Sequence, residues 1–264
     1  MFNQKILTFS AIAIISFTIL SSCNNSFQAK TQTTIKKEIL TDIAAITQNV
    51  ETYLNRSVLV RNDIIETVGN QGIILDKDRV FSGATILVIS TSQIPAIDLT
   101  NKTPEVLLRG TVQQLNLTKV KQEYGLNLDP SLYGKYEGKP VIIATSIILS
   151  PDPEDTTNYP EDYYGKYLAI KGEVEDVEDF GIFELDEEQA FGGEDLLVLQ
   201  VKPKIKLKEE QMVIVYGVLR PFNLDELEKN YDLDWDVSIK EKVEVEYAQK
   251  PVFIGQKIIV LSSY

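Results

Sequence analysis

Short runs of Val, Ile and Leu, bounded by Gly, Pro, Asn and Asp, make up most of the apolar sequence after residue 40. Runs of this composition and length are typical of β-strands. Between residues 170 and 175 apolar and charged positions alternate, which favours an antiparallel strand with one face in water. We therefore expect a mainly β protein. The predicted strands occupy residues 58–64, 72–75, 85–89, 106–117 and 141–149, and then 167–174, 181–185, 196–201, 212–219 and 252–261.

A few segments have the spacing of short helices. Asp42 can cap a helix over residues 43–54, in which apolar residues recur every three or four positions. Residues 224–228 fit a short helical turn. Apolar residues four positions apart predict a helix over 239–247, although the alternation of Glu244 and Glu246 also fits a strand.

The predicted strands form two copies of one unit. Five sequence landmarks occur twice in the same order, at an offset of 107 to 111 residues. The clearest pairs are the strand glycines, Gly110 and Gly217, and the Lys-Pro pairs at 139–140 and 250–251. Such self-similarity predicts a duplicated domain. We place the first domain at 41–150, a Pro- and Asp-rich linker at 151–157, and the second domain at 158–264.

The first 22 residues do not fit this pattern. Lys5 is the only charged residue before Cys23, and residues 6–20 are almost wholly apolar. This arrangement is typical of a secretory signal peptide and is too short and interrupted to favour a membrane span. Leu20-Ser21-Ser22-Cys23 resembles a bacterial lipobox, and Cys23 is the only cysteine in the chain.

The lipobox resemblance implies cleavage between Ser22 and Cys23 and attachment of diacylglycerol to the Cys23 thiol, with acylation of the new amino end as a further step. Two or three acyl chains, at roughly 0.8 kcal/mol per buried CH₂, anchor a protein stably where one does not. The alternative is an ordinary signal peptide that is cut elsewhere. Residue 24 is Asn rather than the Asp that resembles an inner-membrane retention signal, which favours the outer membrane. Residues 23–40 are polar without a period and predict a flexible tether.

The amino-acid composition excludes several kinds of catalytic and binding site. The 264 residues include no histidine and one cysteine, and the formal net charge is −13. Cys/His zinc sites, Ser-His-Asp or Cys-His triads and an intramolecular disulfide are therefore excluded. An acidic chain is also a poor nucleic-acid binder, because phosphate contacts need clustered Lys and Arg.

Two kinds of acidic segment could form a site. Asp232, Asp234 and Asp236 resemble the start of a calcium loop, but valines stand where an EF-hand needs its Gly and its bidentate Glu. These residues are thus only weak metal candidates, and we expect no metal and no cofactor. The acidic runs at 173–179 and 184–188 fall at predicted hairpin tips and favour a solvated acidic face.

Five strands per hundred residues, with glycines inside the strands, resemble the OB-fold barrel. Residues 163–174 are similar to the start of many bacterial OB-type domains, in which one glycine opens the first strand and a second lets it bend. Here these are Gly165 and Gly172, and Asn55 and Asn62 stand at the same places in the first unit. Asn tolerates a positive φ better than most residues. The resemblance implies two tandem five-stranded OB-like barrels with short helices, covering residues 41–264.

These features together predict a non-catalytic lipoprotein of the bacterial cell envelope, with its body outside the cytoplasm. We expect the tandem barrels to bind a protein partner, and the acidic charge favours a basic one. The alternative is a small-molecule or glycan-binding lipoprotein that uses aromatic residues on a barrel face. A concave aromatic-lined cavity would favour the second interpretation, and a flat apolar patch the first.

Overall fold

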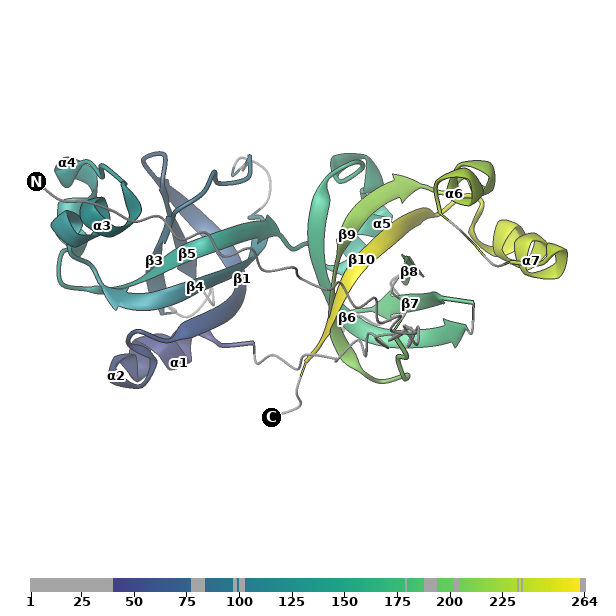
Figure 1. Ribbon diagram of the computed structural model, residues 1–264, viewed down its shortest axis with the longest axis horizontal. Helices are drawn as coiled ribbons and strands as arrows, with labels where there is room; N and C mark the ends of the chain where they lie inside the picture. The colour runs from purple at the N-terminus through teal and green to yellow at the C-terminus, as the bar shows by residue number, and fades with distance from the viewer. Residues whose placement is uncertain are drawn as a thin grey trace, which may run out of the picture. The chain divides into compact units, whose positions relative to one another are not determined.

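The computed structural model describes residues 40–76, 84–96, 99, 103–178, 180–187, 194–201, 205–231, 233 and 235–261 (Figure 1). The predicted signal peptide and nearly all of the tether, including Ser22 and Cys23, lie outside the described residues. The protein is mainly β, as predicted, and contains two closed five-stranded barrels with short helices. None of the helices in the described ranges is long and apolar enough to cross a membrane.

The first barrel has the strand order β1-β2-β3-β5-β4 and closes between β1 and β4. The pair β3–β5 is parallel, and the other pairs are antiparallel. Its strands are β1 (Ser57–Val68), β2 (Gly72–Asp76), β3 (Thr85–Ser90), β4 (Glu105–Gln114) and β5 (Pro140–Leu149). Its helices are α1 (Ile43–Gln48), α2 (Val50–Tyr53), α3 (Leu117–Tyr124), α4 (Pro130–Tyr133) and the 3₁₀ turn η1 (Gly134–Tyr136).

The second barrel repeats this order as β6-β7-β8-β10-β9, again with one parallel pair, β8–β10. Its strands are β6 (Tyr167–Glu178), β7 (Ile182–Asp186), β8 (Leu196–Gln200), β9 (Met212–Pro221) and β10 (Pro251–Val260). Its helices are α5 (Pro153–Asn158), the 3₁₀ turn η2 (Pro160–Asp162), α6 (Leu224–Asn230) and α7 (Val237–Tyr247). Two tandem barrels of equal topology are compatible with duplicated OB-like domains.

Several helices begin directly after a residue whose side chain caps them. At some of these places the apolar pattern also fitted a strand. The predicted fourth strand runs to residue 117, but β4 ends at Gln114 because Asn116 caps α3 with its side chain. The ambiguous segment after residue 236 is the helix α7, capped by Asp236. Equivalent positions cap equivalent helices in both copies, as Asn116 and Asn223 do for α3 and α6.

The segment 151–157 differs from the linker that the sequence suggested. It contains most of α5, whose residues Pro153 and Thr156 are buried. At an offset of 110 residues, α5 corresponds to α1 of the first copy, and Asp152 corresponds to Asp42. The second copy therefore begins with this helix, and the covalent crossing between the barrels is shorter than the composition indicated.

Two backbone requirements explain the recurring glycines. The turn before the first strand of each barrel needs a positive φ, which is 60° at Asn55 and 74° at Gly165, so the substitution of Asn for Gly preserves the turn. At Gly110 a Cβ atom would lie 2.7 Å from the carbonyl oxygen of Ile143 on the neighbouring strand β5. Gly217 makes the same close approach to β10, which accounts for a glycine at this place in both copies.

Each barrel has its own apolar core, and a separate apolar cluster lies between the barrels. This seam comprises Leu59, Leu107, Ala169, Ile214, Tyr216 and Ile259, with Leu40, Ile148 and Leu261 packed at its margin. Leu59 and Ala169 are equivalent positions in the two copies, as are Leu107 and Ile214. The barrels thus meet through the same face of each, as the subunits of a two-fold symmetric dimer do.

Candidate functional site

The face that OB barrels use for ligands is filled in both copies. In that fold, the exposed side of the second and third strands and the adjoining loops bind oligonucleotides or oligosaccharides. In the first barrel this side of β2, β3 and β5 is buried beneath the segment between β4 and β5, which contains α3 and α4. The cluster contains Ile74, Leu87, Ile89, Val141 and Ile143 from the strands and Val120, Leu128 and Tyr133 from the covering segment. The Tyr133 hydroxyl donates to the Val68 carbonyl oxygen at the end of β1.

The second barrel is covered in the same way by α6 and α7 and the segment between them. Trp235 is 6% exposed, and its Nε1 donates to the Phe180 carbonyl oxygen at 3.2 Å. Its ring also meets the Phe180 ring edge-on, with centroids 5.7 Å apart. The buried cluster contains Ile182, Leu197, Leu199, Val252 and Ile254 from the strands and Leu227, Trp235, Val243 and Tyr247 from the cover.

The weak metal candidates divide into two groups. Asp232 and Asp234 lie outside the described residues. Asp236 caps α7, where its Oδ1 accepts hydrogen bonds from the Ile239 N–H and the Ser238 hydroxyl, each at 3.0 Å. The bond from Ile239 lowers the pKa of the Asp236 carboxyl, as expected for a capping carboxylate. Across the described ranges, no group of three or more His, Cys, Asp or Glu side chains could hold a metal ion.

Glu184 corrects the expectation of a wholly solvated acidic face. This residue of β7 points away from the barrel core, but α7 covers it and leaves it 8% exposed. Burial raises the pKa of its carboxyl, while a hydrogen bond with Tyr247 and the charge of Lys250 act in the opposite direction. Burial and the adjacent Glu184 raise the pKa of the Tyr247 hydroxyl. Glu184 belongs to the acidic run that was expected to be solvated, and the sequence pattern could not show that a helix covers this face.

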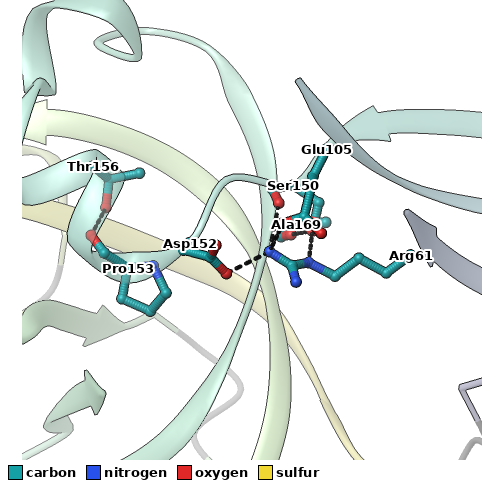
Figure 2. A network of polar contacts seen from close by, with 7 residues as sticks. All are labelled: Arg61, Glu105, Ser150, Asp152, Pro153, Thr156 and Ala169. Carbon is teal, nitrogen blue, oxygen red and sulfur yellow. Dashed lines mark hydrogen bonds and ion pairs between the residues drawn. The ribbon is translucent and has the colours of Figure 1, made fainter. Parts of the chain in front are cut away.

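A polar network lies where the chain passes from the first barrel to the second (Figure 2). We refer to Arg61, Glu105, Ser150 and Asp152 as the junction network. Nη2 of Arg61 donates to Asp152 Oδ1 at 2.6 Å and to the Ser150 carbonyl oxygen at 2.9 Å, and it also pairs with Glu105. Nε of Arg61 donates to Ser150 Oγ at 3.0 Å. The Ser150 hydroxyl in turn donates to the Ala169 carbonyl oxygen on β6 at 2.5 Å.

The junction network is unusually rich in carboxylates. Burial raises the pKa of Glu105 to about 7, Arg61 opposes this shift, and Asp152, Asp63 and Asp155 add to it. Burial also raises the pKa of Glu187, with contributions from Asp152, Glu154 and Asp155 and an opposing effect of Arg61. Glu105 and Asp152 thus share one guanidinium, and the charges of the neighbouring carboxylates make the ionisation of these groups mutually dependent.

The sequence did not single out the junction network, because Arg61 and Ser150 are 89 residues apart. A signal was nevertheless present in the comparison of the two copies. Strand pairing places Arg61 at the position of Lys171 and Glu105 at the position of Met212. An ion pair therefore occurs in one copy where the other has a lysine and an apolar residue.

A groove of about 430 Å³ opens at one end of the first barrel, where the turn before β1 meets the end of β4. Much of its wall is polar. The Asn116 side chain accepts from the Lys119 N–H at 2.8 Å, and Glu137 accepts from the Leu117 N–H at 3.1 Å. The groove is lined by Leu54, Asn55, Gln113, Gln114, Leu115, Asn116, Lys119, Glu137 and Gly138, none of which is aromatic.

The aromatic residues that recur in both copies are used for packing. Tyr247 is buried in the cover of the second barrel, and Tyr136 is half-buried against the cover of the first. Lys139 and Lys250, which precede the recurring prolines, lie over these two rings at 5.8 and 5.7 Å from the centroids.

No protein-family profile matches the chain, and no curated protein matches its sequence.

Proposed function

We propose that this protein is a non-catalytic lipoprotein of the bacterial cell envelope whose tandem OB-like barrels bind a protein partner. Cys23 would carry the lipid after cleavage behind Ser22, and the polar tether would hold the barrels outside the cytoplasm. The resemblance of Leu20-Ser21-Ser22-Cys23 to a lipobox supports the anchor. The absence of Asp at position 24 favours the outer membrane.

The observation that carries the choice of a protein partner is the covering of both ligand faces. An extended ligand that bound as in other OB barrels would have to displace Tyr133 and Leu128 from one barrel, or Trp235 and Tyr247 from the other. Each of these side chains is buried, so displacement would expose a large apolar area at a cost of about 25 cal/mol per Å². A protein partner needs no such opening, because it can dock on the outer surface of the covered barrels.

The charge of the chain indicates what kind of partner would fit. Loss of residues 1–22 removes Lys5 and no acidic residue, so the net charge changes from −13 to −14. Acidic side chains gather around the β6–β7 hairpin, where burial and then Asp186 raise the pKa of both Glu175 and Asp195. Such a surface attracts a basic protein and raises its association rate at low ionic strength.

A quantitative pull-down from detergent-solubilised envelope tests the proposal. The native chain serves as bait, and Cys23→Ala shows whether attachment to the membrane depends on this residue. A double variant, Glu175→Gln with Asp195→Asn, should recover less of a basic partner, and the loss should be greatest at low salt. The matched control, Glu51→Gln with Glu66→Gln, removes two exposed charges from the first barrel and should bind normally.

The possible results separate the anchor from the binding function. Cys23→Ala that remains in the membrane would contradict the lipoprotein assignment but leave protein binding open. A partner that binds the native chain and both double variants equally would show that the acidic surface of the second barrel is not used. Recovery of no stoichiometric partner would contradict protein binding itself.

The groove in the first barrel favours a second candidate function, the binding of a small ligand. Its volume of about 430 Å³ lies within the usual range of small-molecule sites. Its amide side chains could hydrogen-bond to the hydroxyls of a neutral saccharide. Amide chemical-shift changes confined to Gln113, Gln114 and Asn116 on titration with chito-oligosaccharides would support this function, and unchanged spectra would count against it.

A further inference from the structure

We propose that the junction network is a proton-dependent lock, which acid fastens and rising pH loosens, so that pH sets how firmly the two barrels are held together. This inference concerns the relation between the barrels and does not depend on the identity of a partner. It stands on the hydrogen bonds at the crossing, on the apolar seam beside them and on the arrangement of charges.

The hydrogen bonds form a continuous path from one barrel to the other. Glu105 on β4 pairs with Arg61 on β1, Arg61 binds Ser150, and Ser150 binds the Ala169 carbonyl oxygen on β6. Asp152, the residue before α5, provides a second link to the same guanidinium. These bonds surround the covalent crossing, so they fix the direction in which the second barrel leaves the first (Figure 2).

The two copies show that the Ser150 bond has a special role. In the first copy, the Thr41 N–H donates to the Leu59 carbonyl oxygen at 2.7 Å. The equivalent residue in the second copy is Pro151, which has no N–H to donate. The Ser150 hydroxyl instead satisfies the Ala169 carbonyl oxygen, which is equivalent to that of Leu59. The same Ser150 Oγ accepts from Arg61, so the backbone of β6 is coupled directly to the junction network.

The apolar seam alone would not fix the orientation. Hydrophobic association has no directional preference, and the seam consists largely of aliphatic side chains on two barrel surfaces. The charge-assisted hydrogen bonds of a guanidinium do have a preferred geometry. The seam therefore holds the barrels together, while the junction network selects one arrangement.

The groups that face this network are mostly acidic. Asp63 lies on β1, Asp152 precedes α5, Glu154 and Asp155 lie on α5, and Glu187 follows β7. The four other carboxylates raise the pKa of Glu105, of Glu187 or of both. Within the described part of the chain, Arg61 is the cation whose charge acts on both glutamates. Tyr163 also senses Asp155, but its pKa is raised to about 12, so it stays protonated near neutral pH.

The direction of the pH effect follows from proton linkage. With the junction closed, burial raises the pKa of Glu105 from 4.5 to about 7. When the barrels part, the carboxyl regains water and its pKa falls toward the ordinary value. The closed form therefore binds more protons between these values, and it loses stability as pH rises through about 7. When Glu105 is protonated, the Arg61 guanidinium pairs with the Asp152 carboxylate alone. When Glu105 is ionised, a second carboxylate competes with Asp152 for the same guanidinium.

A distance measurement between the barrels tests the lock. The full chain with Cys23→Ser has no other cysteine, so Glu51→Cys on α2 and Glu244→Cys on α7 provide two exposed sites for spin labels. Between about pH 5 and about pH 9, the distance distribution should broaden with a midpoint near neutrality. Glu105→Gln, which mimics the protonated side chain, should keep the distribution narrow throughout.

Two further variants make the result decisive. Asp63→Asn removes a charge that disfavours ionisation of Glu105, so the midpoint should move to lower pH. Glu66→Gln, an exposed neighbour on the same strand, should behave as the unmodified chain does. A width that does not change with pH would overturn the proposal, as would a Glu105→Gln protein that broadens like its parent. Should Glu105→Gln fail to fold, the shift caused by Asp63→Asn still decides the question.

Discussion

Arg61 and Lys171 occupy the same place in the two barrels, on β1 and β6, but their neighbours differ. Arg61 pairs with Glu105, while the residue at the corresponding place on β9 is Met212. Positions that determine the backbone path of each barrel, such as Gly110 and Gly217, carry the same residue in both copies. The copies therefore share their fold and differ at the junction, where the second barrel is attached to the first.

The covers of the two barrels offer a second comparison. Leu128 in the first barrel and Trp235 in the second are equivalent residues, and both are buried over the ligand face of the fold. Different side chains thus fill the same space. Closure of this face is a property of the repeated unit rather than of one barrel.

Truncation of the covering side chains should have the largest effect. Trp235→Ala should lower the free energy of unfolding by about 4 kcal/mol, and Leu128→Ala by about 3 kcal/mol, because each change loses buried area and leaves a cavity. Urea unfolding followed by circular dichroism measures both. In Leu128→Ala the single tryptophan still reports on the second barrel, so its fluorescence shows whether the loss spreads. Losses below about 1 kcal/mol would contradict the covered faces.

Removal of the junction cation should have the next largest effect. Arg61→Ala should lower the free energy of unfolding by about 3 kcal/mol, because it leaves the half-buried carboxylates of Glu105 and Asp152 without their partner. Lys171→Ala at the equivalent place should lower it by less than about 1 kcal/mol, since Met212 rather than a carboxylate occupies the position of Glu105 there. Differential scanning calorimetry of the two variants gives the comparison. Equal losses would show that the junction has no special electrostatic role.

The pH dependence of stability should be smaller. Burial raises the pKa of Glu105 in the folded chain to about 7, so its contribution is greatest in acid and is lost as pH rises from the unfolded value of 4.5 through 7. The Glu105 side chain is still 25% exposed, so water screens its charge. We therefore expect the free energy of unfolding to change by only about 2 kcal/mol over this pH range. Urea unfolding of Glu105→Gln and the parent chain at several pH values isolates this contribution. Parallel curves for the two proteins would refute it.

The turns before β1 and β6 should give the smallest difference. Gly165→Ala should lower the free energy of unfolding by about 1 kcal/mol, because Ala is unfavourable at a φ of 74°. Asn55→Gly, the reverse exchange at the equivalent turn, should change it by no more than about 0.5 kcal/mol. Thermal unfolding of both variants tests whether the turns are interchangeable. A large loss in Asn55→Gly would mean that this side chain has a role beyond the turn.

The strands could be predicted because their signals are local. Runs of β-branched residues between turn residues gave the position of all ten observed strands to within a few residues. Helix α3 was not predicted, because Leu115 and Leu117 extend the apolar pattern of β4, although Asn116 carries a capping signal. The candidate sites were harder to predict. Glu184 was expected on a solvated acidic face, but α7, about 60 residues further along the chain, buries it.

The sequence by itself determined the strands, the duplication and the lipobox-like segment around Cys23, because these depend on neighbouring residues or on direct comparison of two segments. Only the tertiary structure decided that helices close both ligand faces and that Arg61 joins Glu105, Ser150 and Asp152. These features arise from contacts between residues far apart in the chain, and the Glu105 pKa near 7 arises from loss of water around the carboxyl. Neither the contacts nor the burial has a local pattern from which it could be predicted.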